Sequence, residues 1–442
     1  MVTRMGVASV GGWESVMLTA KGNLCDDGVL PEFPEPPSFG GITRGESKGM
    51  INKARPVVLA AGGTGGHIFP AEALARELLA RGHRVVLVTD RRGGAFGDAL
   101  PEVTVHRIRA ATMLPGLMGK LQTLGELVLG TFQARRLIRS LNPLAVVGFG
   151  GYPSVPTVVA AARAGLPVVL HEQNAVLGRA NRLLSSAALR IAVSFGAVAG
   201  VKEAERDKLV LTGNPVRPDF MAARSQPYPL AGADDPLHLL VLGGSQGARI
   251  FSEVVPAALA LLPEHLRARI RLSQQCRPED LAAARVALDT AGMEKAELSS
   301  FFTDVPARLG RCHLAICRAG ASTITELTAA GRPAILVPYP HAMDDHQTAN
   351  AEAVAECGGA WLMPQSAFTP EALAARLEAL LTLPSRLESA AAAARAAGTP
   401  DAAQRLADVV LRLSAAALPQ EQAVSRSAKA ERASTLKVEA AQ

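Results

Sequence analysis

Aromatic residues, cysteines and long apolar runs are all scarce in this chain of 442 residues. Phe, Trp and Tyr make up 4% of the residues although 48% are hydrophobic, a composition typical of an alanine- and leucine-rich α/β protein. The longest apolar runs stay under about ten residues, whereas a membrane-spanning helix needs roughly 20. The five cysteines are odd in number and lack metal-ligand spacing, which favours reduced thiols in the cytosol over disulfides or a zinc site.

Several signatures of phosphate, metal and nucleic-acid binding are missing as well. No G-x-x-x-x-G-K-[ST] sequence occurs, which excludes a P-loop enzyme. The net charge is +6, but no RNP, helix-turn-helix or zinc motif accompanies it, so we expect no nucleic-acid partner. The chain has no Asp-x-Asp beside a predicted strand, and the doublet Asp344-Asp345 has the wrong spacing, so we expect no bound metal.

The two ends of the chain lack any hydrophobic period. Residues 1–50 contain Gly-Gly and proline-rich stretches and are predicted to be a disordered N-terminal extension. The one apolar stretch that resembles a signal peptide is interrupted by Gly11, Gly12 and Glu14. Residues 417–442 are polar and charged without a pattern, which predicts a disordered tail.

Strands and helices alternate twice between these ends. The predicted strands lie near 57–61, 84–89, 103–108, 144–148, 167–170 and 189–193, and then near 238–242, 269–273, 298–301, 314–317 and 334–337. Such alternation predicts parallel sheets with helices on both faces. The proline-rich stretch from Gly213 to Pro236 is predicted to be a stiff linker. The expected fold is therefore α/β, with two Rossmann-like, doubly wound domains and a cleft between them.

A glycine-rich loop follows the first predicted strand. The apolar run that ends at Ala61 leads into Gly62-Gly63-Thr64-Gly65-Gly66-His67 and then into a helical pattern. Glycines allow positive φ and close approach of a ligand to the backbone, and the free amides of a helix start favour anions. Comparable loops at Gly148–Pro153 and Gly243–Arg249 also follow strands. Three loops at strand ends facing one cleft indicate a binding site.

A dinucleotide site is the alternative interpretation of the first loop. The fingerprint G-x-G-x-x-G counted from Gly63 requires a glycine where Ile68 stands. Asp90, however, ends the next strand roughly where an acid that binds ribose would lie. NAD binding therefore stays open as the weaker alternative.

Positive charge is concentrated in the first half. Residues 51–216 contain 20 Lys and Arg against 10 Asp and Glu, whereas residues 217–416 contain 18 against 21. Arginine-rich composition alone is one explanation, and an anionic membrane surface or a phosphorylated lipid is the other. The apolar stretch Met113–Lys120 precedes a helix with Arg135, Arg136 and Arg139. We interpret this region as a membrane-docking face, the alternative being an ordinary core helix and loop.

Seven motifs stand in order along residues 55 to about 415. They are Gly62–Pro70, Gly148–Pro153, His171–Asn174, Gly213–Arg217, Gly243–Arg249, Cys317–Glu326 and His341–Asn350. Together they resemble the MurG family of UDP-N-acetylglucosamine:lipid I N-acetylglucosaminyltransferases, in glycosyltransferase family 28. The resemblance implies an inverting enzyme of GT-B fold that needs no cofactor or metal.

The resemblance also implies different roles for the two domains. Residues 51–213 would bind the acceptor and the membrane, residues 214–396 would bind UDP-GlcNAc, and a helix over 397–416 would pack back on the first domain. The implied product is lipid II, formed on the cytoplasmic face of the inner membrane for peptidoglycan synthesis, cell shape and division. Lipid I, an anionic membrane surface and the proteins of cell-wall synthesis and division are the implied partners.

The donor site implied by the resemblance draws on both domains. Its residues are Thr64, Gly65, Gly66, Asn174, Arg217, Ser245, Phe302, Ala321, Ser322, Thr323, Ile324, Thr325, Glu326 and Gln347. Glu326 would bind both ribose hydroxyls. The local sequence favours a different role, because Thr323-x-x-Glu326 also fits a capping box, in which Glu326 would bond to the cap amide.

Glycosyl transfer requires a base that takes the proton of the acceptor hydroxyl. His67, at the junction of strand, loop and helix, is the candidate, because an imidazole titrates near neutrality. A structural histidine is the alternative. Tyr152, His171 and Glu172 are acceptor-side candidates, of which His171 and Glu172 are next in line as base. Transfer to another lipid, a UDP-GlcNAc epimerase on the same fold and a non-enzymatic nucleotide-sugar-binding module remain alternatives.

Overall fold

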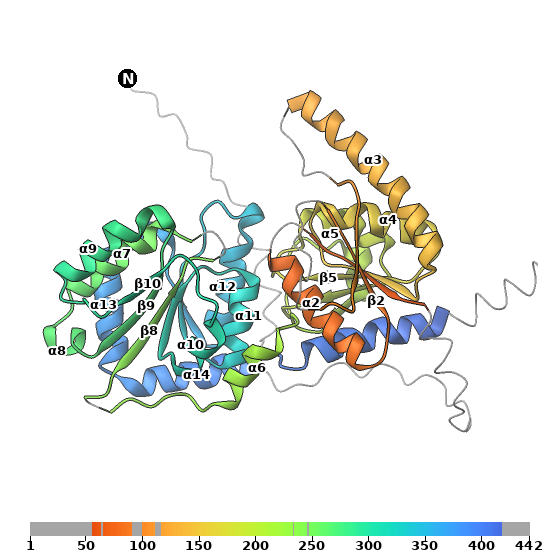
Figure 1. The fold of residues 1–442 in the computed structure, drawn as a ribbon. Coiled ribbons are helices and arrows are strands. Elements are labelled where there is room, and N and C mark those ends of the chain that lie inside the picture. Colours follow the sequence, from red (N-terminus) through yellow and green to blue (C-terminus); the bar gives the residue numbers. More distant parts are fainter. Residues whose placement is uncertain are drawn as a thin grey trace, which may run out of the picture.

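The computed structural model describes residues 55–62, 65–90, 100–110, 116–232, 234–244 and 247–417. Within them lie two sheets side by side, each built from parallel strands (Figure 1). The first has seven strands in the order β3-β2-β1-β4-β5-β6-β7, and the second has six in the order β10-β9-β8-β11-β12-β13. The α/β fold with two doubly wound sheets is therefore confirmed. The extension 1–50 and the tail 418–442 lie outside the described residues.

The first sheet contains all six strands predicted for the first half. Its strands are β1 Val57–Ala60, β2 Val85–Thr89, β3 Thr104–Arg107, β4 Ala145–Gly148, β5 Val168–Glu172, β6 Arg190–Val193 and β7 Leu209–Leu211. Its helices are α2 Gly65–Ala80, α3 Gly116–Leu141, α4 Val155–Arg163 and α5 Arg179–Leu184. In the centre, Leu59 of β1 lies between Leu87 and Val147. The unpredicted β7 is a three-residue edge strand that is only partly buried.

The second sheet contains the five strands predicted for the second half and one more. Its strands are β8 Leu237–Leu242, β9 Ile270–Gln275, β10 Glu297–Ser299, β11 Leu314–Cys317, β12 Ala334–Leu336 and β13 Ala360–Leu362. Its helices are α6 Pro218–Ser225, α7 Arg249–Ala260, α8 Glu264–Arg267, α9 Leu281–Thr290, α10 Val305–Arg311, α11 Ala321–Ala330, α12 His346–Glu356, α13 Pro370–Leu381 and α14 Pro384–Ala397. The extra strand, β13, is again a short edge strand.

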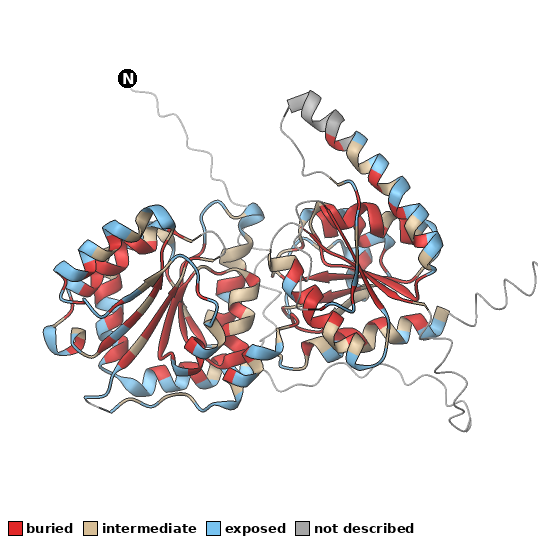
Figure 2. Ribbon diagram, viewed as in Figure 1, coloured by how far each residue is buried: buried red, intermediate tan, exposed pale blue. Residues whose placement is uncertain are grey.

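Both sheets are covered on both faces. Val57 and Leu59 of β1 belong to one apolar cluster and Val58 belongs to the cluster on the opposite face, as the period of two in a strand requires. Figure 2 shows the buried strands enclosed by helices whose outer sides are exposed. Among the described helices, none is long and apolar enough to cross a bilayer.

The stretch between the two domains differs from the expectation. The predicted stiff linker contains α6, whose Phe220 is fully buried in a cluster with Leu309 and Ile324, so this stretch packs on the second domain. A last helix, residues 402–417, returns to the first domain (Figure 1) and adds Leu406 to its core. In parallel α/β sheets, ligands bind at the carboxyl ends of the strands. Here the loop after β5 contacts α12, which follows β12, and α2, which follows β1, contacts α11, which follows β11.

Candidate active site

The two glycine-rich loops of the first domain are packed against each other. The described part of the first loop ends at Gly62, where an added Cβ would lie 2.7 Å from the Cβ of Pro153. Gly150 and Gly151 have φ of 85° and 71°, a region that favours glycine. An added Cβ at either position would lie 3.3 Å from the ring of His67. The backbone of Gly150 and Gly151, which have no side chains, therefore forms a close-fitting surface for the imidazole of His67.

His67 has the protonation state that a general base needs. Burial lowers the pKa of His67 below its ordinary value, and the nearby Glu172 carboxylate opposes this shift without cancelling it. The imidazole is therefore neutral at neutral pH. Its Nδ1 atom is buried, and none of the described residues hydrogen-bonds to it.

His171 is held entirely by the protein. Its side chain is fully buried, and its Nε2 lies 3.2 Å from the carbonyl oxygen of Gly213 while its Nδ1 lies 3.1 Å from the amide nitrogen of Gln173. Nδ1 as acceptor and Nε2 as donor is the tautomer that satisfies both contacts. Burial lowers the pKa of His171 to about 4. Its geometry therefore fits bonding to the neighbouring loop.

Glu172 organises the loop that follows β5. One carboxylate oxygen accepts from the backbone and side-chain nitrogens of Asn174 at 3.1 and 3.2 Å. The other accepts from the backbone of Gly178 and the side chain of Asn181, both at 2.8 Å. With four donors already in place, the carboxylate is engaged in positioning this loop. Tyr152 lies in a short 3-10 helix, Tyr152–Ser154, directly after the second glycine loop.

Asn350 joins the two domains, a role that the sequence reasoning missed. It lies on α12 and is fully buried. Its side-chain oxygen accepts from the backbone of Ala175 at 2.7 Å, and its nitrogen donates to Asn174 at 3.1 Å and to the carbonyl of Ala319 at 3.2 Å. The quoted motif His341–Asn350 contains it, but nothing in its local pattern separates a bridge from an ordinary polar helix residue.

Arg217 and Glu326 meet where the two domains come together. The Arg217 guanidinium lies 4.4 Å from the ring centre of Phe69 on α2 and 5.1 Å from that of Phe220. It also lies 3.7 Å from the carboxylate of Glu326. Its Nε is buried, and no described residue accepts a hydrogen bond from it. An arginine so placed has donors left for an anionic ligand.

Glu326 does not cap its helix. Helix α11 begins at Ala321 with Gly320 as N-cap and without a side-chain cap bond, so the capping-box alternative is wrong. The helix starts three residues earlier than that box requires, which places Glu326 in the second turn. Its side chain is 16% exposed, and burial raises its pKa to about 7 although Arg217 acts in the opposite direction. An acid held this way is costly to the fold and is typical of a functional site.

The other donor-side candidates surround the start of α11. Ser322 has a buried hydroxyl that is unpaired among the described residues. The Thr325 hydroxyl accepts from Asn214 at 3.1 Å and so ties the helix to the interdomain stretch. Gln347 accepts from the backbones of Ala319 at 3.2 Å and Tyr339 at 2.9 Å. These contacts fix the loops around the start of α11.

Five candidates give less information about a ligand. Phe302 is buried under the Arg308 guanidinium, 4.0 Å from its ring centre, which leaves its backbone as the part that can reach a ligand. Gly65 and Gly66 form the first turn of α2. Thr64 and Ser245 lie outside the described residues.

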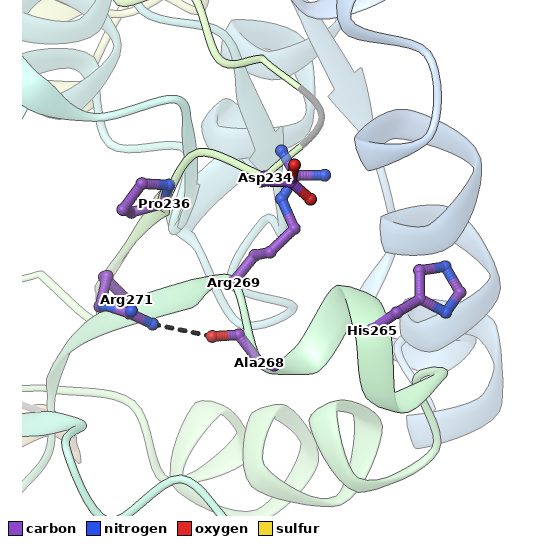
Figure 3. A pocket seen from close by; sticks show the side chains of 6 residues that line it. All are labelled: Asp234, Pro236, His265, Ala268, Arg269 and Arg271. Atoms are coloured by element: carbon purple, nitrogen blue, oxygen red, sulfur yellow. Dashed lines mark hydrogen bonds between the residues drawn. The ribbon is translucent and has the colours of Figure 1, made fainter.

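One surface pocket lies at the opposite end of the second sheet. It is lined by Asp234, Pro236, His265, Ala268, Arg269 and Arg271 (Figure 3). Arg269 donates to the carbonyls of Asp235 and Gly232, and Arg271 donates to that of Ala268. These guanidinium groups fasten the amino ends of β8 and β9, so we assign the pocket no ligand. In the described residues, no group of three or more His, Cys, Asp or Glu side chains could hold a metal ion.

Both halves of the chain match one family. Residues 57–193 match the glycosyltransferase family 28 N-terminal domain, and residues 238–406 match the glycosyltransferase family 28 C-terminal domain. The UDP-N-acetylglucosamine–N-acetylmuramyl-(pentapeptide) pyrophosphoryl-undecaprenol N-acetylglucosamine transferase of Rhodospirillum centenum is 64% identical over 80% of this chain and 94% of that protein. The enzyme of the same description from Paramagnetospirillum magneticum is 58% identical over 81% of this chain and 96% of that protein.

Solved structures agree with this relationship. Acinetobacter baumannii MurG superposes with a TM-score of 0.66 and 32% identity over 81% of this chain and 99% of that chain. A UDP-GlcNAc 2-epimerase from Neisseria meningitidis reaches a TM-score of 0.57 at 14% identity over 80% of this chain and all of that chain, which shows the shared fold alone. The family models and the similar enzymes thus define the class of this chain, a glycosyltransferase of GT-B fold. Within that class, the chain belongs to glycosyltransferase family 28, in its MurG branch.

Proposed function

We propose that this chain transfers N-acetylglucosamine from UDP-N-acetylglucosamine to undecaprenyl-pyrophosphoryl-N-acetylmuramyl-pentapeptide, as the name of its Rhodospirillum centenum relative describes. The observation that carries the proposal is the meeting of the candidate base and the candidate donor-binding groups where the two domains come together. Phe69, two residues after His67, contacts Arg217, and Arg217 in turn lies 3.7 Å from Glu326. Acid–base chemistry from one domain and ligand recognition from the other therefore share one site.

The second domain binds the donor in this proposal. The amides at the start of α11 and the guanidinium of Arg217 stabilise the negative charge that grows on the departing diphosphate. Glu326 accepts hydrogen bonds from the two ribose hydroxyls, which compensates for its burial. The unpaired Ser322 hydroxyl adds a donor at the same helix start.

The first domain supplies the proton acceptor. The 4-hydroxyl of the N-acetylmuramyl residue attacks the anomeric carbon of N-acetylglucosamine, and the bond from that carbon to the diphosphate oxygen breaks. The hydroxyl proton passes to neutral His67, and a single displacement inverts the anomeric configuration. The glycine surface of Gly150 and Gly151 holds the ring in place, and Tyr152, His171 and Glu172 position the acceptor side of the cleft.

Helix α3 is the proposed membrane-docking face. It projects from the first domain in Figure 1 and exposes Val128 and Phe132, one turn apart, by 60% and 69%. Arg135, Arg136 and Arg139 follow on the same helix and are exposed. Apolar side chains beside cations suit peripheral binding to anionic lipid on the cytoplasmic face of the inner membrane. The apolar stretch Met113–Lys120 has no described side chains.

The function is tested by incubating the purified full chain with UDP-GlcNAc and a water-soluble lipid I analogue. We expect release of UDP and a product heavier by one N-acetylglucosamine residue. Conversion of UDP-GlcNAc to its 2-epimer without acceptor would instead identify an epimerase. Binding of UDP without turnover would identify a nucleotide-sugar-binding module.

A further inference from the structure

The segment between β12 and α12 has an unusual backbone. Asp344 and Asp345, in the short helical turn Met343–Asp345 and its junction with α12, have φ of 53° and 50°. Two successive residues other than glycine in the left-handed region cost free energy, although Asp tolerates this region better than most residues do. The Thr348 hydroxyl donates to Asp345 at 2.7 Å, which secures the junction from within the second domain.

The turn directs Asp344 to the other domain. One carboxylate oxygen lies 3.2 Å from Arg179 and the other lies 3.7 Å from Arg182. Both arginines belong to α5 of the first domain, which directly follows the loop organised by Glu172. Arg182 also donates to the carbonyl of Leu177, so α5 is tied back to that loop. Ion pairs therefore connect a strained turn of one domain to the catalytic loop region of the other.

The same segment reaches the donor side. Gln347, one turn along from Asp344, holds the backbone of Ala319 beside the start of α11. His346, at the start of α12, is fixed within the same turn, because its Nδ1 lies 2.7 Å from the carbonyl oxygen of Met343. A shift of this junction would therefore move donor-side and base-side groups relative to each other.

We propose that Asp344 is a positioning residue whose ion pairs with Arg179 and Arg182 hold the second domain in the orientation that sets Glu326 and Gln347 opposite His67. The proposal rests on the proposed function for its kinetic consequence. Its structural consequence, a more closed cleft, is independent of any activity. Asn350 supplies a separate bridge, so losing the ion pairs shifts the equilibrium between closed and open forms without separating the domains.

Small-angle X-ray scattering of the full chain at low salt, without substrates, tests the structural consequence. We expect Asp344→Asn to have a larger radius of gyration than the wild type. In about 0.5 M salt the difference should nearly disappear, because salt screens the half-exposed ion pairs that only the wild type has. Asp289→Asn is the matched control, since its carboxylate lies 3.7 Å from Arg285 on the same helix, within one domain. An unchanged radius of gyration in Asp344→Asn would overturn the proposal.

Kinetics distinguish positioning from direct acceptor binding by the arginines. Asp344→Asn should lower kcat about 2–5-fold, the usual scale of partly exposed ion pairs, and leave UDP affinity unchanged. The triple variant with Arg179→Gln and Arg182→Gln should be no worse than Asp344→Asn alone, because all three groups act as one unit. Additive losses, or a lower acceptor KM in Asp344→Asn, would show that the arginines bind the acceptor and would refute the proposal. An inactive wild type would contradict the proposed function while leaving the scattering result valid.

Discussion

Replacing Glu326 by glutamine should stabilise the ligand-free protein and weaken its binding of UDP. Glu326 is 16% exposed, and Arg217, at 3.7 Å, does not compensate for the loss of hydration. Glutamine has nearly the same shape and removes the charge. The residue therefore costs stability in the empty site, and the proposed bonds to ribose explain why the carboxylate is there.

The pKa of Glu326 gives the magnitude and its pH dependence. A carboxyl whose pKa rises from an ordinary 4.5 to about 7 holds its proton more tightly in the folded state than in the unfolded state. The free-energy cost of Glu326 to the folded state is therefore absent below about pH 4. The cost grows as the pH rises between the two pKa values and reaches about 3 kcal/mol near pH 8. Glu326→Gln should thus gain about 3 kcal/mol over the wild type near pH 8 and less than about 1 kcal/mol near pH 5.

Urea unfolding at those two pH values measures the gain, and titration calorimetry with UDP measures binding. We expect the loss of the charged hydrogen bonds to weaken UDP binding by about 1–3 kcal/mol. Glu326→Gln that is less stable than the wild type at the higher pH, or equally changed at both pH values, would refute the account. Unchanged UDP affinity would show that the carboxylate does not contact the ribose.

Three further outcomes are expected. Turnover should persist in EDTA, because Arg217 and the start of α11 supply the positive potential for the diphosphate; loss of activity that magnesium restores would contradict this. Gly151→Ala should lower kcat and cost about 1 kcal/mol of stability, because an added Cβ at φ of 71° strains the loop and meets His67 at 3.3 Å; unchanged kinetics would show that the ring needs no such surface. Phe132→Ser should weaken binding to vesicles that contain anionic lipid, whereas Val286→Ser, an equally exposed site on α9, should not.

The central strands were predictable because burial on both faces demands apolar runs. The run Val57–Ala60 and its counterparts carry that signal, while the edge strands β7 and β13 are only partly buried and carry a weaker one. Helix α6 was not predicted within the linker for a related reason. Phe220, the large apolar side chain that α6 buries, packs against α10 and α11, which are distant in the sequence.

The site was predictable where its functional residues lie close together in the sequence. The glycine loop and His67 are adjacent in the sequence, so their juxtaposition could be inferred from the residues. The capping-box hypothesis for Glu326 was also local, and it was wrong because the helix begins at Ala321, directly after a loop whose Ala319 amide donates to Gln347 of α12. Asn350 and Asp344 contact residues more than 160 positions away, a distance in sequence that no local pattern can bridge.

The role of His67 is tested most directly by the steady-state kinetics of His67→Ala with UDP-GlcNAc and the lipid I analogue. The account predicts that kcat falls by about 10²–10⁴, the scale of general-base loss, while the donor KM changes little. The acidic limb of the pH profile of kcat should disappear with the imidazole. A variant that keeps near-normal kcat would contradict the account and would place the base elsewhere in the cleft.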